Sequence, residues 1–81
     1  MIDRLSTLTP RERAVLGALM EGLNAEQIAV RMYVSVSTVR TYIRFILMKL
    51  GVNTQIAAVA YANRTLLSEQ YGTVVESLVA S

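Results

Sequence analysis

The chain has 81 residues, which suffices for one small domain, so residues 1–81 are predicted to form a single unit. It contains no Cys and no His, which removes disulfides, thiolate metal sites and the commonest general acid or base. The six acidic residues are scattered, and none pairs with another at helical spacing. We therefore expect no metal, no cofactor and no enzyme activity.

The net charge is only +2, but the charges are unevenly placed along the chain. No acidic residue occurs between Gln27 and Ser68, and the five basic residues of this stretch are Arg31, Arg40, Arg44, Lys49 and Arg64. A basic segment in a near-neutral chain suits a polyanion such as DNA. A solvated helix face is the alternative, and charge alone does not decide between them.

The first predicted helix begins with a strong start signal. Thr9 can cap the helix, Pro10 suits the first helical position, and Glu12 stands where it completes a capping box. Apolar residues follow at helical spacing, and Gly22 is expected to end the helix as a left-handed cap.

Two further helices follow, each with its own cap. Asn24 caps a short helix of about two turns. Ser35 caps a longer helix over about 36–50, which is expected to end at Gly51. A short helix, a tight turn and a longer helix with basic residues in its first turns predict a helix-turn-helix.

Asn53 or Thr54 caps a fourth helix over about 54–64, which is apolar on almost every side. Such a helix is normally buried on more than one side, so one face is expected to meet a partner. Residues 66–81 also show apolar residues at helical spacing, although Gly72 counts against a fifth helix. This segment either extends an interface, covers the fourth helix, or is disordered. No strand pattern occurs, so the fold is predicted to be all-α.

The third helix separates into two faces when each residue is advanced by about 100°. The core stripe consists of Val39, Ile43, Ile46 and Leu50, with Tyr42 and Leu47 beside it. The opposite face carries Ser37, Arg40, Thr41, Arg44 and Met48. Arg40 and Arg44 project from the same side one turn apart. An Arg side chain matches the two acceptors of guanine with two donors, so this face can read base edges.

The N-terminal residues of the second helix of a helix-turn-helix meet the base edges of DNA. In this chain they include Ser37 and Thr38, whose hydroxyl groups can hold a phosphate. Simple capping and solvation is an equally good interpretation of both residues, and the sequence leaves the two open.

Several motifs occur together in the order typical of one family. They are Leu8-Thr9-Pro10-Arg11-Glu12-Arg13, Gly22-Leu23-Asn24, Ile28-Ala29, Thr38-Val39-Arg40-Thr41-Tyr42-Ile43 and Ile46-Leu47-Met48-Lys49-Leu50-Gly51-Val52. Together they resemble the LuxR/FixJ-type (GerE-type) helix-turn-helix DNA-binding domain of bacterial transcription regulators. The resemblance covers about residues 5–65, with residues 66–81 as a C-terminal extension.

The resemblance implies a four-helix domain that binds double-stranded DNA, with residues 36–50 in the major groove. It implies base contacts at Arg40, Thr41 and Arg44, and phosphate contacts at Ser37, Thr38 and Lys49. It also implies a homodimer through the fourth helix, for which Ala58, Tyr61 and Ala62 are the expected interface residues. Members of the family usually carry an N-terminal regulatory domain, which this chain lacks, so either a fragment or a stand-alone regulator is expected.

Some positions depart from the family pattern. Tyr42 stands where the family usually has His, Phe45 where a polar residue is commoner, and Ala57 where Glu is frequent. Tyr42 keeps a packing role, Phe45 is expected to pack on the helix flank, and Ala57 makes the fourth helix more apolar. None of these residues removes the predicted DNA-reading face.

Two other function classes remain as alternatives. A protein-interaction or oligomerisation module is favoured by the apolar content and by the fourth helix, whereas a small helical enzyme has no supporting residue. No apolar run is long enough to span a membrane and no signal peptide is evident, so a cytoplasmic location is expected.

Overall fold

The computed structural model describes residues 4–66, which form four α-helices and one short 3₁₀ helix. In chain order they are η1 (Arg4–Thr7), α1 (Pro10–Met20), α2 (Ala25–Met32), α3 (Val36–Leu50) and a fourth helix (Gln55–Leu66). Residues 4–66 contain no strand, which confirms the predicted all-α class. The fifth helix considered for residues 66–81 falls outside the described residues, apart from Leu66.

Each helix begins at the capping residue that the sequence indicated. The Thr9 hydroxyl accepts a hydrogen bond from the Glu12 amide, and the Glu12 carboxylate accepts one from the Thr9 amide. The Asn24 and Ser35 side chains accept amide hydrogen bonds at the starts of α2 and α3. Thr54 caps the fourth helix, since its hydroxyl accepts from the Ala57 amide at 3.1 Å. These bonds satisfy amides that have no partner inside their helices.

Left-handed residues cap α2 and α3, whereas α1 is capped by the right-handed Glu21 and the left-handed Gly22 follows it. Gly22 and Gly51 have φ angles of 90° and 70°. Tyr33 ends α2 with a φ of 57°, and it is the non-glycine residue with positive φ among residues 4–66. The Val34 amide donates to the Ala29 carbonyl across this turn. The tight turn of the motif is therefore closed by backbone hydrogen bonds around a residue type that rarely adopts this conformation.

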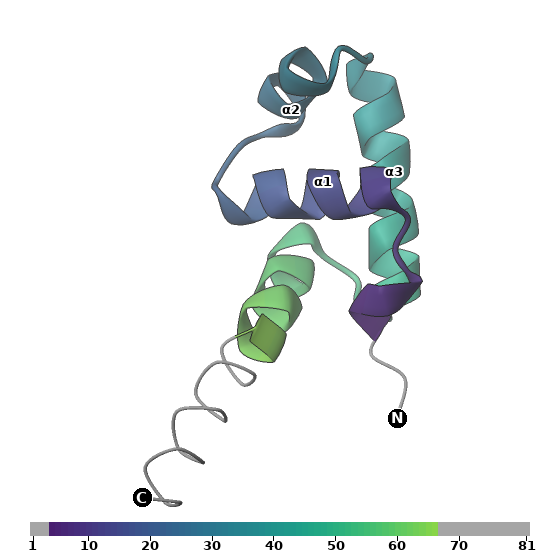
Figure 1. Cartoon of the computed structure of the whole chain (residues 1–81), viewed down its shortest axis with the longest axis vertical. Helices are drawn as coiled ribbons and strands as arrows, with labels where there is room; N and C mark the ends of the chain where they lie inside the picture. The colour runs from purple at the N-terminus through teal and green to yellow at the C-terminus, as the bar shows by residue number, and fades with distance from the viewer. Residues whose placement is uncertain (1–3, 67–81) are drawn as a thin grey trace, which may run out of the picture.

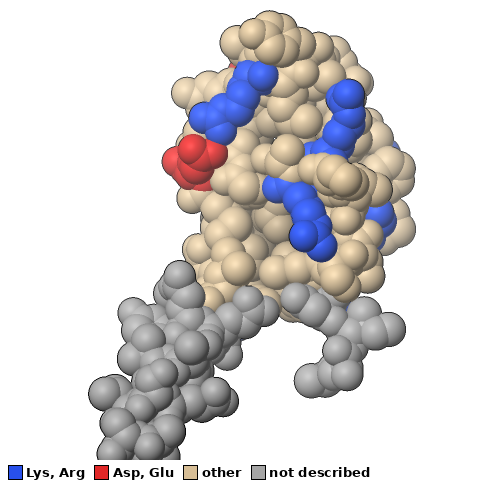
Figure 2. All heavy atoms as spheres, in the orientation of Figure 1, with Lys and Arg blue, Asp and Glu red and all other residues tan. Residues whose placement is uncertain are grey.

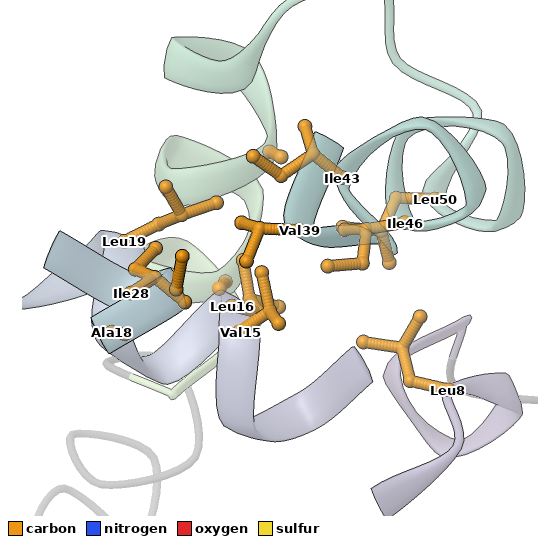
Figure 3. Close-up of a cluster of buried hydrophobic side chains, with 13 residues drawn as sticks. Leu8, Val15, Leu16, Ala18, Leu19, Ile28, Val39, Ile43, Ile46 and Leu50 are labelled. Carbon is orange, nitrogen blue, oxygen red and sulfur yellow. The ribbon is translucent and has the colours of Figure 1, made fainter. Parts of the chain in front are cut away.

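The core lies where α1, α2 and the fourth helix meet the inner face of α3 (Figure 3). Its members are Leu8, Val15, Leu16, Ala18, Leu19, Ile28, Ala29, Val39, Ile43, Ile46, Leu50, Ala58 and Ala62. The predicted core stripe of α3 is confirmed, because all four of its residues are buried. Burial of each large aliphatic side chain stabilises the fold by about 1.5–3 kcal/mol.

The arrangement leaves the outer side of α3 open. In Figure 1, α1 crosses α3, α2 lies beside the first turns of α3, and η1 lies near its last turn. The fourth helix turns back beneath α1. Between residues 4 and 66, no single helix is long and apolar enough to cross a membrane; α3 and the fourth helix pass that test only as a pair, bent by 57°.

Two polar contacts hold α3 at its C-terminal end. Arg4 donates from Nη1 to the Leu50 carbonyl at 3.0 Å, which satisfies a carbonyl at the end of the helix. Lys49 Nζ lies 2.7 Å from Oε1 of Glu12, which joins α3 to the first turn of α1. Helix α3 is thus fixed by an apolar inner face and by two polar contacts.

Candidate nucleic-acid interface

The candidate interface is the outer face of α3, which the buried stripe orients toward solvent. The residues expected there are all exposed, and they are Ser37, Arg40, Thr41, Arg44 and Met48. Their exposure follows from the fold, because the opposite side of the same helix is anchored in the core. The surface is mixed rather than uniformly charged, since Met48 is 65% exposed and Phe45 is 42% exposed.

Arg40 and Arg44 differ in their surroundings. Nη2 of Arg40 lies 3.8 Å from Oε1 of Glu26, an acidic residue in the first turn of α2. Arg44 has no ion-pair partner among residues 4–66. The stretch between Gln27 and Ser68 has no acid, but Glu26 lies just before it, and the fold brings this residue to Arg40.

Thr41 directs its hydroxyl proton inward. Its Oγ1 donates to the Ser37 carbonyl at 3.1 Å, one turn back in α3. The hydroxyl oxygen can still accept a hydrogen bond, and the methyl group can contact apolar matter such as a thymine methyl. Thr41 therefore offers an acceptor and a methyl group to a ligand, while its donor is used within the helix.

The N-terminal turn of α3 resolves part of the choice between capping and phosphate binding. Ser35 Oγ accepts from the Thr38 amide at 3.0 Å and donates to the Thr38 hydroxyl at 2.9 Å. The Thr38 amide is thus occupied, but its hydroxyl proton remains able to donate to a phosphate. Ser37 is exposed and adjacent to it. Capping is performed by Ser35, and a phosphate role for Ser37 and Thr38 stays a prediction.

Lys49, expected at a phosphate, has an internal partner that sequence reasoning missed. Its ammonium group binds Glu12, whose side chain is buried, and Lys49 itself is only partly exposed. Burial raises the pKa of the Glu12 carboxyl, but hydrogen bonds from Lys49 and Thr9 outweigh it and hold the pKa below the ordinary value. In this structure Lys49 compensates a buried carboxylate, so its contact with a phosphate stays an untested prediction.

The structure of the fourth helix differs from the dimer interface that the resemblance implied. Ala58 and Ala62 are 0% and 1% exposed within the domain itself, so they offer no surface to a second copy. Tyr61 is half-buried and packs against the same core. The alanines face inward because their small side chains allow close packing of this helix on the core. The outward residues are instead Ile56, which is 83% exposed, and Ala60 and Asn63.

Charge on the molecular surface is predominantly basic in the view of Figure 2, where separate blue side chains occupy more of the face than red ones. Two of the ion pairs are exposed, Arg31–Glu21 at 2.6 Å and Arg40–Glu26 at 3.8 Å. Within residues 4–66 no group of acidic residues could hold a metal ion.

An apolar hollow of about 280 Å³ lies between η1, α1 and the fourth helix, and Arg13 is its ionisable lining residue.

Comparison with known proteins defines the class. Residues 6–62 match the family model described as "Bacterial regulatory proteins, luxR family". This range contains α1, α2, α3 with its basic outer face, and most of the fourth helix. The match spans more than half of the chain. This protein therefore belongs to the luxR family of bacterial regulatory proteins, a class of DNA-binding transcription regulators rather than of enzymes.

A curated relative gives a more specific likeness. The chain is 41% identical over 70 residues to the DNA-binding transcriptional activator DevR/DosR of Mycobacterium tuberculosis (strain ATCC 25618 / H37Rv). The aligned part covers 86% of this chain but 32% of the relative. The chain thus spans about a third of the length of the curated relative that it matches.

Proposed function

We propose that this chain binds double-stranded DNA sequence-specifically as the DNA-binding part of a bacterial transcription regulator, with α3 in the major groove. The observation that supports this most directly is the outer face of α3, on which two arginines and a threonine are exposed one turn apart. Arg40 and Arg44 each offer a two-pronged donor to guanine, and Thr41 offers a methyl group and an acceptor. Membership of the luxR family of bacterial regulatory proteins also supports DNA binding.

Phosphate contacts would come from the first turn of α3 in this proposal. Ser37 and Thr38 present hydroxyl groups beside the helix N-terminus, where the helix dipole favours an anion. Such contacts position the helix but carry little sequence information. We place the protein in the bacterial cytoplasm, where its DNA is found.

The proposed oligomer on DNA is a homodimer through the outward face of the fourth helix. The exposed apolar side chain of Ile56 supports this, together with the exposed Ala60 on the same helix. A two-fold dimer would bind an inverted repeat with half-sites about one helical turn apart. A regulatory domain joined to this one is a further part of the proposal, since the matched relative is about three times longer.

The test measures binding to random-sequence duplexes by fluorescence anisotropy at two salt concentrations. We expect wild-type binding to weaken steeply with salt, because phosphate contacts release counterions. Arg40→Glu/Arg44→Glu should abolish binding while circular dichroism stays unchanged. Arg11→Glu/Arg13→Glu, on α1, makes the same change in net charge and is the matched control. Selection from the bound pool then provides a preferred duplex.

Two results would count against the proposal. If both double variants lose binding equally, the net charge rather than the face of α3 is responsible. If folded wild-type protein fails to bind at low salt, the outer face of α3 does not bind DNA in this chain. In that case the exposed apolar residues Phe45 and Met48 favour the second candidate, a protein-interaction module.

A further inference from the structure

Arg40 has an acidic partner on the other helix of the motif, whereas Arg44 has none among residues 4–66. Glu26 lies in the first turn of α2, and its Oε1 is 3.8 Å from Nη2 of Arg40. Both side chains are largely exposed, at 69% for Arg40 and 63% for Glu26. Exposed pairs of this kind contribute little to folding stability. The pair therefore has a larger effect on what Arg40 can bind than on the fold.

A DNA duplex offers two kinds of acceptor to the Arg40 guanidinium. The first is a phosphate, which is charged and present at every position, and the second is the neutral edge of guanine. When the guanidinium binds a phosphate, the Glu26 carboxylate is brought close to a like charge. When it binds guanine through two donors, the other donors stay available to the carboxylate and no like charge is opposed. Glu26 thus penalises one contact more than the other.

We propose that Glu26 is a positioning residue that sharpens the sequence preference of Arg40 by disfavouring its contacts with phosphate. This inference rests on the proposed function, in which Arg40 reads a base edge. It gives α2 a role in specificity without a base contact of its own. It also predicts that the two arginines contribute differently, since Arg44 is free of this restraint.

The experiment measures affinity for two probes at one salt concentration, namely the selected duplex described above and a random-sequence duplex pool. We expect Glu26→Gln to bind the random pool about two- to fivefold more tightly, the range that an exposed pair supports. The gain on the selected duplex should be smaller, so the ratio of the two affinities falls. In the Arg40→Ala background, Glu26→Gln should change both affinities by the same factor.

Glu21→Gln is the matched control, because it removes the same charge from a different exposed pair, Glu21–Arg31. It should leave the ratio of the two affinities unchanged. The inference is overturned if Glu26→Gln behaves like this control, or if its effect on the ratio persists without Arg40. An unchanged ratio for Arg40→Ala alone overturns the base-reading role itself and the present inference with it, so the two failures are distinguishable.

Discussion

At the scale of single residues, the buried Glu12 carboxylate links two helices away from the outer face of α3. It accepts hydrogen bonds from the Thr9 amide at 2.8 Å and from Lys49 at 2.7 Å through one oxygen. One side chain therefore completes the cap of α1 and also ties α1 to α3. A buried charge with two such donors stabilises the fold only while both donors remain.

Replacement of this carboxylate should destabilise the domain. Glu12→Gln keeps an acceptor for Thr9 but removes the charge opposite Lys49, so we expect a loss of roughly 1–3 kcal/mol in the free energy of unfolding. Urea unfolding followed by circular dichroism measures it. Glu21→Gln, in an exposed ion pair, is the control and should change stability by less than about 1 kcal/mol. Equal effects of the two substitutions would contradict the structural role of Glu12.

The same carboxylate should make stability depend on acid pH. Its pKa is lower in the folded chain than the ordinary 4.5, so the unfolded state binds the proton more readily. The stabilising contribution is complete above pH 4.5 and is lost as the pH falls through the folded pKa. Unfolding free energies measured from pH 7 down to pH 3 should decline in wild type and decline less in Glu12→Gln. Parallel curves for the two proteins would refute this.

At the scale of elements, the left-handed residues near the helix ends restrict which substitutions are tolerated. Gly51 ends α3, and a Cβ atom added there would collide with the Arg4 guanidinium. Gly22 follows the cap of α1 and is also left-handed, with a φ of 90°, but it has open space around it. The two glycines thus share a backbone requirement and differ in their surroundings, which makes them a natural pair for comparison.

Gly51→Ala should therefore destabilise more than Gly22→Ala. Each alanine meets the cost of a left-handed conformation, about 1–2 kcal/mol, but Gly51→Ala also displaces Arg4 from the Leu50 carbonyl. Thermal unfolding of both variants gives the comparison. In an Arg4→Ala background the extra loss should disappear, because the colliding group is absent. An additive double variant would show that the collision is relieved in another way.

Tyr33 offers the opposite prediction, a gain in stability. It is 95% exposed, so its side chain contributes little burial, yet it holds a φ of 57°. Tyr33→Gly should raise the free energy of unfolding by up to about 1 kcal/mol, since glycine adopts this conformation without steric cost. Tyr33→Ala retains the Cβ atom and should give no such gain. Denaturant midpoints of the three proteins at equal m-values measure the difference.

Local signals in the sequence were sufficient for the elements but not for their partners. Thr9, Asn24 and Ser35 act as caps because their side chains reach amides only three residues away. The Arg40–Glu26 contact depends on how α2 crosses α3, which periodicity within one helix does not specify. The cap of α2 at Tyr33 was missed because tyrosine rarely adopts the left-handed conformation, so its presence is no signal for one.

The fourth helix shows the same limit at the candidate interface. Its sequence is apolar on almost every side, so a helical wheel provides no bias toward either face. The resemblance alone implied an interface at Ala58 and Ala62, whereas the structure buries both against the core. By contrast, the two faces of α3 differ sharply in polarity, which is why its core stripe and its exposed arginines were both predicted correctly.

At the scale of the whole molecule, the proposed homodimer depends on the outward face of the fourth helix. Ile56 is the most exposed large aliphatic residue among those described, at 83%, and its substitution should leave the core intact. We expect Ile56→Glu to shift wild-type dimers to monomers in sedimentation velocity, with unchanged circular dichroism. Val30→Glu places the same charge at another exposed apolar position, 76% exposed, and should not.

Either of two outcomes would contradict this dimer. Wild-type protein that stays monomeric at high concentration and also on the selected duplex has no dimer to disrupt. A dimer that survives Ile56→Glu unchanged must use a different surface. Loss of DNA affinity by Ile56→Glu, at preserved helicity, would connect the interface to binding.

The two polar contacts at the end of α3 also have a kinetic consequence. Arg4 and Leu50 are 46 positions apart, and Glu12 and Lys49 are 37 apart. Closing such long loops has an entropic cost, and a single hydrogen bond is too weak to meet it before the apolar core has collapsed. We expect both contacts to form after the folding transition state, so their removal should accelerate unfolding and leave the folding rate nearly unchanged. On this expectation the two contacts lengthen the lifetime of the folded domain without speeding its folding.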